Sequence, residues 1–111
     1  MDGERGNMEV NLNIKDRITL ISILPSTGKI TDLVEVMDLV KLIKFSDEER
    51  KLVNLEEKDG RITWDISADT PKTYNINFAQ VSIIKDTIKK MDDAGSISLN
   101  MLDTCLKFSK L

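Results

Sequence analysis

Residues 53–66 carry the strongest structural signal in this chain, the pattern of a β-hairpin. Two runs that alternate apolar and polar residues, 53–57 and 62–66, lie on either side of a short turn. Asp59 and Gly60 at its tip suit the two positive-φ positions of a tight type I′ turn. Pairing outward from this turn puts Leu55 opposite Trp64 and Val53 opposite Ile66 on one face. The fold must therefore contain a small antiparallel β-element with an apolar face to bury.

The composition favours one soluble domain. A chain of 111 residues with 41% apolar residues can bury a single core without metals or disulfides. We expect this domain to span residues 8–111, after a flexible polar tail at residues 1–7, with Met8 as an alternative natural start. The net charge of −3 gives no electrostatic reason to expect nucleic acid or an anionic membrane as a partner. The single Cys105 cannot form an internal disulfide, which favours the inside of a cell.

Helical periodicity and capping residues predict four or five helices. The first should run from Ile14 to Leu24, with Asn13 as its N-cap and Pro25 as its stop. The others should begin at the caps Thr31, Ser46, Asn77 and Ser98. The helix after Thr31 should bury Leu33, Val36, Met37, Val40 and Ile43. The last helix should bury Leu99, Leu102, Cys105 and Leu106.

Two further strands are predicted by alternating apolar residues, one starting at Met8 and one at Tyr74. They can join the hairpin in a single sheet. The predicted fold class is therefore α+β, with four to five helices packed on a small antiparallel sheet that contains the hairpin at 53–66.

The helix after Thr31 has more apolar residues than one buried face requires. Val34, Leu39 and Leu42 widen its apolar arc well beyond a single stripe. The simplest use of this surplus is self-association or binding of a protein partner. We take these three residues as the candidate partner surface.

Residues suited to catalysis are scarce. The chain has no histidine, which removes the usual general base and the commonest metal ligand. Helix capping explains the acidic group at 47–49, and opposite faces of a strand explain the group at 56–57. The group at 92–93 lies at a helix end, where negative charge is mildly unfavourable, and we take it as solvated surface. A metal-dependent hydrolase would need three such groups in one cleft. We therefore expect no enzyme, no catalytic residue, no cofactor and no metal site.

The basic residues suggest nucleic-acid binding as an alternative function. Lys58 and Arg61 flank the hairpin tip, and Lys85, Lys89 and Lys90 share a later helix. Together they could contact nucleic acid, although nearby aspartates balance the charge of that helix. Affinity for duplex DNA that falls steeply with added salt would favour this alternative.

The order of helix, helix, short helix and hairpin from Ile14 to Ile66 resembles a winged-helix domain, with residues 58–61 as the wing tip. In such domains the helix at 46–52 would be the recognition helix. Here it begins with three acidic residues, 47–49, which would face phosphates with negative charge. The resemblance therefore implies a derivative that binds protein in place of DNA.

A second resemblance rests on the segments 14–17, 23–25 and 45–49, on Trp64 and on the closing segment 90–108. They look like parts of small proteins encoded by phages and prophages of gut bacteria. This resemblance implies an origin in a phage or mobile element and a place in the cytoplasm of a bacterial host. The sequence thus predicts a non-enzymatic interaction protein, with no membrane segment.

Overall fold

The computed structural model describes residues 6–111, which form a five-helix α+β fold. In chain order the elements are β1 (Asn7–Leu12), α1 (Ile14–Ile23), α2 (Ile30–Ile43), α3 (Asp47–Leu52), β2 (Glu56–Lys58), β3 (Arg61–Thr63), the 3₁₀ turn η2 (Ile66–Ala68), β4 (Lys72–Asn77), α4 (Phe78–Asp93), the 3₁₀ turn η3 (Leu99–Met101) and α5 (Leu102–Ser109). Residues 1–5 of the predicted tail lie outside the described part. Asn7 falls in the predicted tail but belongs to β1, where it pairs with Asn77 of β4. The prediction of a tail that extends to residue 7 is therefore wrong at this position.

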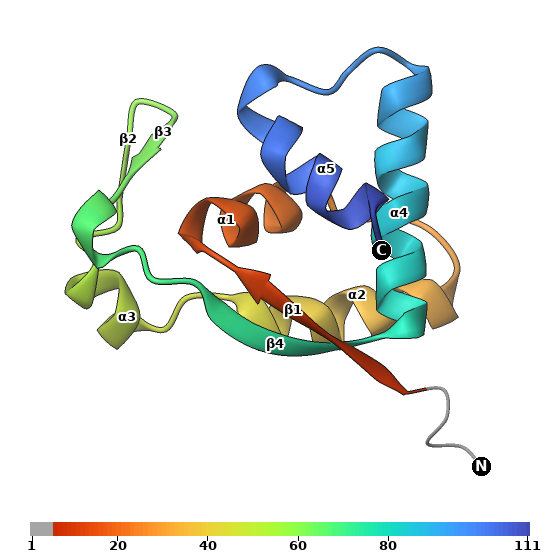
Figure 1. Ribbon diagram of the computed structural model, residues 1–111, viewed down its shortest axis with the longest axis horizontal. Helices are drawn as coiled ribbons and strands as arrows, with labels where there is room; N and C mark the ends of the chain where they lie inside the picture. The colour runs from red at the N-terminus through yellow and green to blue at the C-terminus, as the bar shows by residue number, and fades with distance from the viewer. Residues whose placement is uncertain (1–5) are drawn as a thin grey trace.

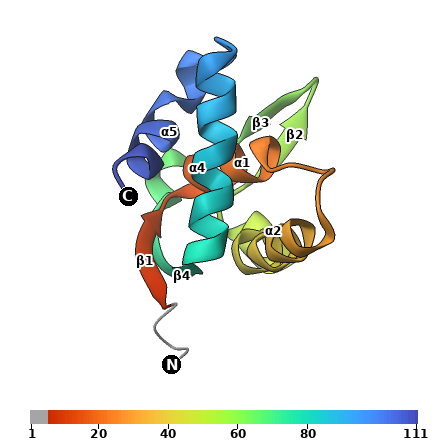
Figure 2. The ribbon, with the colours of Figure 1, turned by 90° about the vertical axis from the view of Figure 1, so that its right-hand side faces the viewer.

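The strands β1 and β4 bring together two segments that lie far apart in the sequence. They pair antiparallel from Asn7 opposite Asn77 to Leu12 opposite Lys72. In Figure 1, α1 and α5 lie above this strand pair and α4 closes one end. Figure 2 shows α2 on one side of α4 and the strand pair on the other. One face of the strand pair is therefore buried under the helices and the other is exposed, as the predicted alternation implies.

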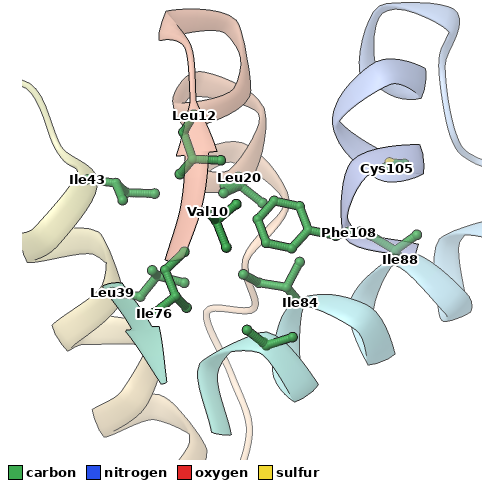
Figure 3. Packing of buried hydrophobic residues seen from close by; sticks show 11 residues of the cluster. Val10, Leu12, Leu20, Leu39, Ile43, Ile76, Ile84, Ile88, Cys105 and Phe108 are labelled. Atoms are coloured by element: carbon green, nitrogen blue, oxygen red, sulfur yellow. The ribbon is translucent and has the colours of Figure 1, made fainter. Parts of the chain in front are cut away.

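The core lies where the strand pair meets the helices α1, α2, α4 and α5 (Figure 3). Its members are Val10, Leu12, Leu20, Leu39, Ile43, Ile76, Val81, Ile84, Ile88, Cys105 and Phe108. Phe108 of α5 is completely buried and lies beside Ile84 and Leu20. Burial of apolar area on this scale is the main favourable term for a domain of this size.

Capping boxes start two of the helices at the predicted residues. The Asn13 side chain accepts a hydrogen bond from the Asp16 amide, and the Asp16 carboxylate accepts one from the Asn13 amide. Asn77 and Gln80 make the same reciprocal pair at the start of α4. The predicted cap Thr31 is wrong, because the backbone enters α2 two residues earlier, with Lys29 as N-cap.

The hairpin forms with the predicted turn and register but stands apart from the other strands. Asp59 and Gly60 both have positive φ, at 54° and 78°. Glu57 pairs with Ile62, in the register that sets Leu55 opposite Trp64. The hairpin makes its own two-stranded sheet, so the prediction of one sheet shared with β1 and β4 is wrong. It projects from the body in Figure 1.

The apolar face of the hairpin is shorter than predicted. Val53 is buried, and its carbonyl accepts a hydrogen bond from the Asp65 amide. Beyond this bond the chain turns into η2, which leaves Ile66 exposed. The prediction that Val53 and Ile66 share a buried face is therefore wrong, because Ile66 is exposed.

The helix α5 buries a different face from the predicted one. Its buried residues are Thr104, Cys105 and Phe108, whereas Leu99, Leu102 and Leu106 are exposed. The turn η3 occupies Leu99–Met101, so the α-helix begins only at Leu102. The Thr104 hydroxyl bonds to the buried Asp16 of α1, which places the side with Thr104, Cys105 and Phe108 inward. Of the four residues predicted to point inward, Cys105 does so.

Candidate interaction surface

An apolar surface on α2 is exposed to solvent. Ile30 is 81% exposed, Met37 51%, Val34 45% and Leu42 42%. Ile30, Val34 and Met37 follow the spacing i, i+4, i+7 and so line up along one side of the helix. Leu42 lies beside this line, about 80° around the axis from Val34 at 3.6 residues per turn. We call these four residues the α2 surface.

The opposite side of α2 packs on the core. Val36, Leu39 and Ile43 are buried there, and Leu39 is only 1% exposed. Leu39 lies about 140° around the helix from Val34, because five residues make well over one turn. Its assignment to the partner surface is therefore corrected to the core, while Val34 and Leu42 lie on the exposed side.

Sequence reasoning missed Ile30 and Met37 as members of the α2 surface. Met37 was assigned to the buried face, and Ile30 lay before the predicted start of the helix. The signal that separates the two sides is the run Val36, Leu39, Ile43, which follows the spacing i, i+3, i+7. Choosing this run as the buried stripe places Met37 in solvent.

The α2 surface also carries charged residues at its centre. Asp38 and Lys41 are exposed and lie between Met37 and Leu42 in the sequence. Both point within about 40° of Val34 around the helix axis. The surface is therefore apolar at its edges, with one acidic and one basic residue near the middle.

Both halves of α2 are fixed to the rest of the fold by hydrogen bonds that are buried or partly buried. Glu35 accepts a hydrogen bond from Asn77 Nδ2 at 3.1 Å, and the Glu35 carbonyl accepts one from Gln80 Nε2 at 3.3 Å. At the other end, Arg17 Nε donates to the carbonyl of Ile43 at 2.8 Å. A helix held in this way presents its outer side in one orientation, which lowers the entropic cost of binding.

Arg17 forms the most extensive polar cluster in the interior. Its guanidinium binds both carboxylate oxygens of Glu49 and donates to the carbonyl of Lys44. The Phe45 ring packs over it at 3.9 Å from the guanidinium carbon. The Arg17 side chain is only 4% exposed, so these contacts replace its lost hydration. The cluster joins α1 to the end of α2 and to α3, which is a structural role.

Glu49 is held ionised by this cluster. Its hydrogen bonds from Arg17, opposed by burial and assisted by Lys72, lower the pKa of Glu49 from an ordinary value of 4.5 to about 2. A carboxylate with this pKa is a poor general acid at neutral pH, where it stays charged.

The stability of the protein should therefore depend on the charge of Glu49. Since its folded-state pKa lies below the ordinary 4.5, ionised Glu49 stabilises the fold fully above that pH, and the contribution is lost as pH falls toward 2. Glu49→Gln should destabilise the protein at neutral pH and reduce its loss of stability between about pH 5 and pH 2 in urea unfolding. The exposed neighbour Glu48 is the control, since Glu48→Gln should keep the pH dependence of the parent protein. A pH dependence unchanged in Glu49→Gln would contradict this role.

A second polar cluster ties α5 to α1. Asp16 is buried and accepts hydrogen bonds from Thr104 Oγ1 and from Lys107 Nζ. Lys107 also donates to the carbonyl of Asn11 at 2.8 Å. Both carboxylate oxygens of Asp16 thus accept hydrogen bonds from α5, and the cluster fixes α5 in place.

The other candidates for chemistry lie apart or are shielded. In residues 6–111 no group of three or more acidic or cysteine side chains is placed to hold a metal ion. Burial, with a smaller effect from the charge of Asp92, raises the pKa of the Cys105 thiol, which lowers the fraction of reactive thiolate.

A small open pocket lies between α1, the start of the hairpin and the neighbouring loops. Its lining residues are Ile18, Ile21, Ser22, Phe45, Arg50, Leu55, Glu56, Glu57 and Ile62. The volume of about 190 Å³ is below the range of about 300–1,000 Å³ typical of sites for small molecules. This pocket could not be predicted from the sequence, because it forms between segments that are distant along the chain.

The basic residues of the alternative nucleic-acid function fall into two separate places. Lys58 and Arg61 lie at the tip of the projecting hairpin, and Lys85, Lys89 and Lys90 lie on α4. Figure 1 shows these elements at opposite sides of the molecule. Lys89 also lies 3.5 Å from the carboxylate of Asp93. The structure therefore does not bring the five residues together into one basic surface.

No helix in the described range has both the length and the apolar character required to cross a bilayer. Comparisons with protein-family models, with curated proteins and with solved structures find no match to this chain. The resemblances to winged-helix domains and to phage-encoded proteins thus stay predictions from the sequence.

Proposed function

We propose that this protein is a non-enzymatic interaction protein that binds another protein chain through the α2 surface. The observation that carries the proposal is the exposure of Ile30, Val34, Met37 and Leu42 along one side of a single helix. Exposed apolar residues that gather on one side of a helix are costly in water and commonly mark protein contacts.

Two features of α2 support binding in preference to a passive surface. Its inner side packs on the core through Leu39 and Ile43, so the helix keeps its orientation when the outer side is unoccupied. Met37 is long and flexible, which lets it fill gaps in a protein interface. The charged residues Asp38 and Lys41 would give such an interface a preferred orientation.

The interior charged residues support a scaffold more than an active site. Arg17, Glu49, Asp16 and Lys107 each bond to partners from other elements. The chain also has no histidine for acid–base catalysis near neutral pH. We extend the proposal to an origin in a phage or mobile element, supported by the sequence resemblance.

Site-specific photo-crosslinking in the producing cells tests the proposed function. A photoreactive amino acid at position 37 should give crosslinks to protein, either to a second copy or to another chain. The control carries the same amino acid at position 75, which is exposed on the polar outer side of the β1–β4 pair. Crosslinks at position 37 that do not exceed those at position 75 would overturn the proposal.

A further inference from the structure

On the α2 surface the acidic residue of the central charge pair comes before the basic one, so reversing the helix exchanges the two charges. Asp38 and Lys41 lie equally far from the midpoint between residues 39 and 40, and Met37 and Leu42 lie equally far outside them. A surface with this order is complementary to a reversed copy of itself.

Two-fold symmetry turns this order into specific contacts. When two copies of α2 pack antiparallel about that midpoint, each Asp38 lies next to Lys41 of the other copy. A parallel arrangement would instead place Asp38 beside Asp38, which is unfavourable. The charges therefore select the antiparallel arrangement and fix its register.

We propose that the protein forms a symmetric dimer in which the α2 helices of two copies pack antiparallel across the Asp38 and Lys41 pairs. This inference rests on the proposed function and names its partner as a second copy of this chain. A different protein partner would not require the acidic and basic residues of α2 to lie symmetrically about one midpoint. The self-complementary order is the observation that favours a second copy.

The apolar residues of the α2 surface would surround these charge pairs. Val34, Met37 and Leu42 lie around Asp38 and Lys41 and would shield them partly from water, which strengthens the ionic contacts. A single pair of helices should bury less than the roughly 1,200 Å² of a stable interface, so the dimer should be weak.

Sedimentation equilibrium of the purified protein, up to about 1 mM because weak interfaces of this size need high concentration, tests the dimer through charge reversal. Asp38→Lys creates two contacts between lysines, and Lys41→Asp creates two contacts between aspartates. Each variant should weaken the dimer by about 10-fold or more, since like charges across an interface are costly. The double variant D38K/K41D should recover the dimer, because its charges are exchanged and again opposite.

An equimolar mixture of the two single variants provides the sharpest outcome. Asp38→Lys leaves two lysines on one chain, Lys41→Asp leaves two aspartates on the other, and the mixture should form a heterodimer with both pairs opposite in charge. Both positions are exposed, so each variant should stay folded, which circular dichroism checks.

Three results would overturn the dimer. They are a parent protein that stays monomeric at the highest concentration, single variants that dimerise as the parent does, and a mixture that stays monomeric. Crosslinks from position 37 to a different protein would then leave the proposed function standing. Absence of any excess crosslinking there would remove both.

Discussion

Replacing Arg17 with methionine should lower the free energy of unfolding by about 3–5 kcal/mol, the usual effect of removing one partner of a buried ion pair. The substitution leaves the Glu49 carboxylate without its strongest hydrogen bonds. It also leaves the carbonyl groups of Ile43 and Lys44 without the donor that holds the end of α2. Methionine fills most of the space under Phe45. The loss of unfolding free energy therefore measures the missing polar contacts more than the effect of a cavity.

Lys72 supplies the matched control for Arg17, because it contacts the same carboxylate from the surface. Its ammonium lies 3.2 Å from Glu49, but its side chain is 59% exposed. Lys72→Met should therefore cost less than about 1 kcal/mol in the same urea unfolding measurement. Similar losses for the two variants would contradict the role of Arg17 as the buried link between α1, α2 and α3.

Phe108→Ala should be the most damaging substitution in α5, with an expected loss of about 3–5 kcal/mol in unfolding free energy. The Phe108 ring is 0% exposed and lies among core residues from α1 and α4. Its removal leaves a cavity that the rigid strand pair and α4 cannot fill completely.

Leu106 is the control for Phe108, since it lies on the same helix and is 46% exposed. Leu106→Ala should change the unfolding free energy by about 0.5 kcal/mol or less, as is usual at surface positions. A large loss for Leu106→Ala with little effect of Phe108→Ala would show that α5 packs through the face predicted from sequence.

Local features of the fold could be predicted from the sequence because short-range chemistry decides them. The Asn13 and Asn77 caps depend on side chains three residues away, and both form as predicted. The turn at Asp59 and Gly60 depends on which residues tolerate positive φ. The strands at Met8 and Tyr74 follow from alternation within each segment.

Features that depend on distant contacts could not be predicted in the same way. The alternation in β1 is compatible with pairing to any strand. It does not show whether β1 pairs with β4 or with the hairpin. Arg17 has the appearance of a solvent-facing residue in a helix. Its burial requires Glu49 and the end of α2 to arrive from other parts of the chain.

The candidate surface was half predicted, for a reason specific to α2. So many apolar residues occur in this helix that two buried stripes are compatible with its periodicity. The stripe through Val36, Leu39 and Ile43 packs on the core, which moves Leu39 inside and Met37 outside. The surplus of apolar residues was visible in the sequence, but its direction depended on tertiary packing.

The methyl signals of methionine offer the most direct measurement of whether the α2 surface meets another protein. Met37 is exposed, whereas Met8, Met91 and Met101 are partly buried elsewhere in the fold. In ¹³C-methyl NMR spectra of the labelled protein, recorded first in dilute solution and then in concentrated lysate of the producing cells, we expect the largest shift or broadening at Met37. Unchanged Met37 signals, or larger changes at Met8, Met91 or Met101, would contradict binding through α2.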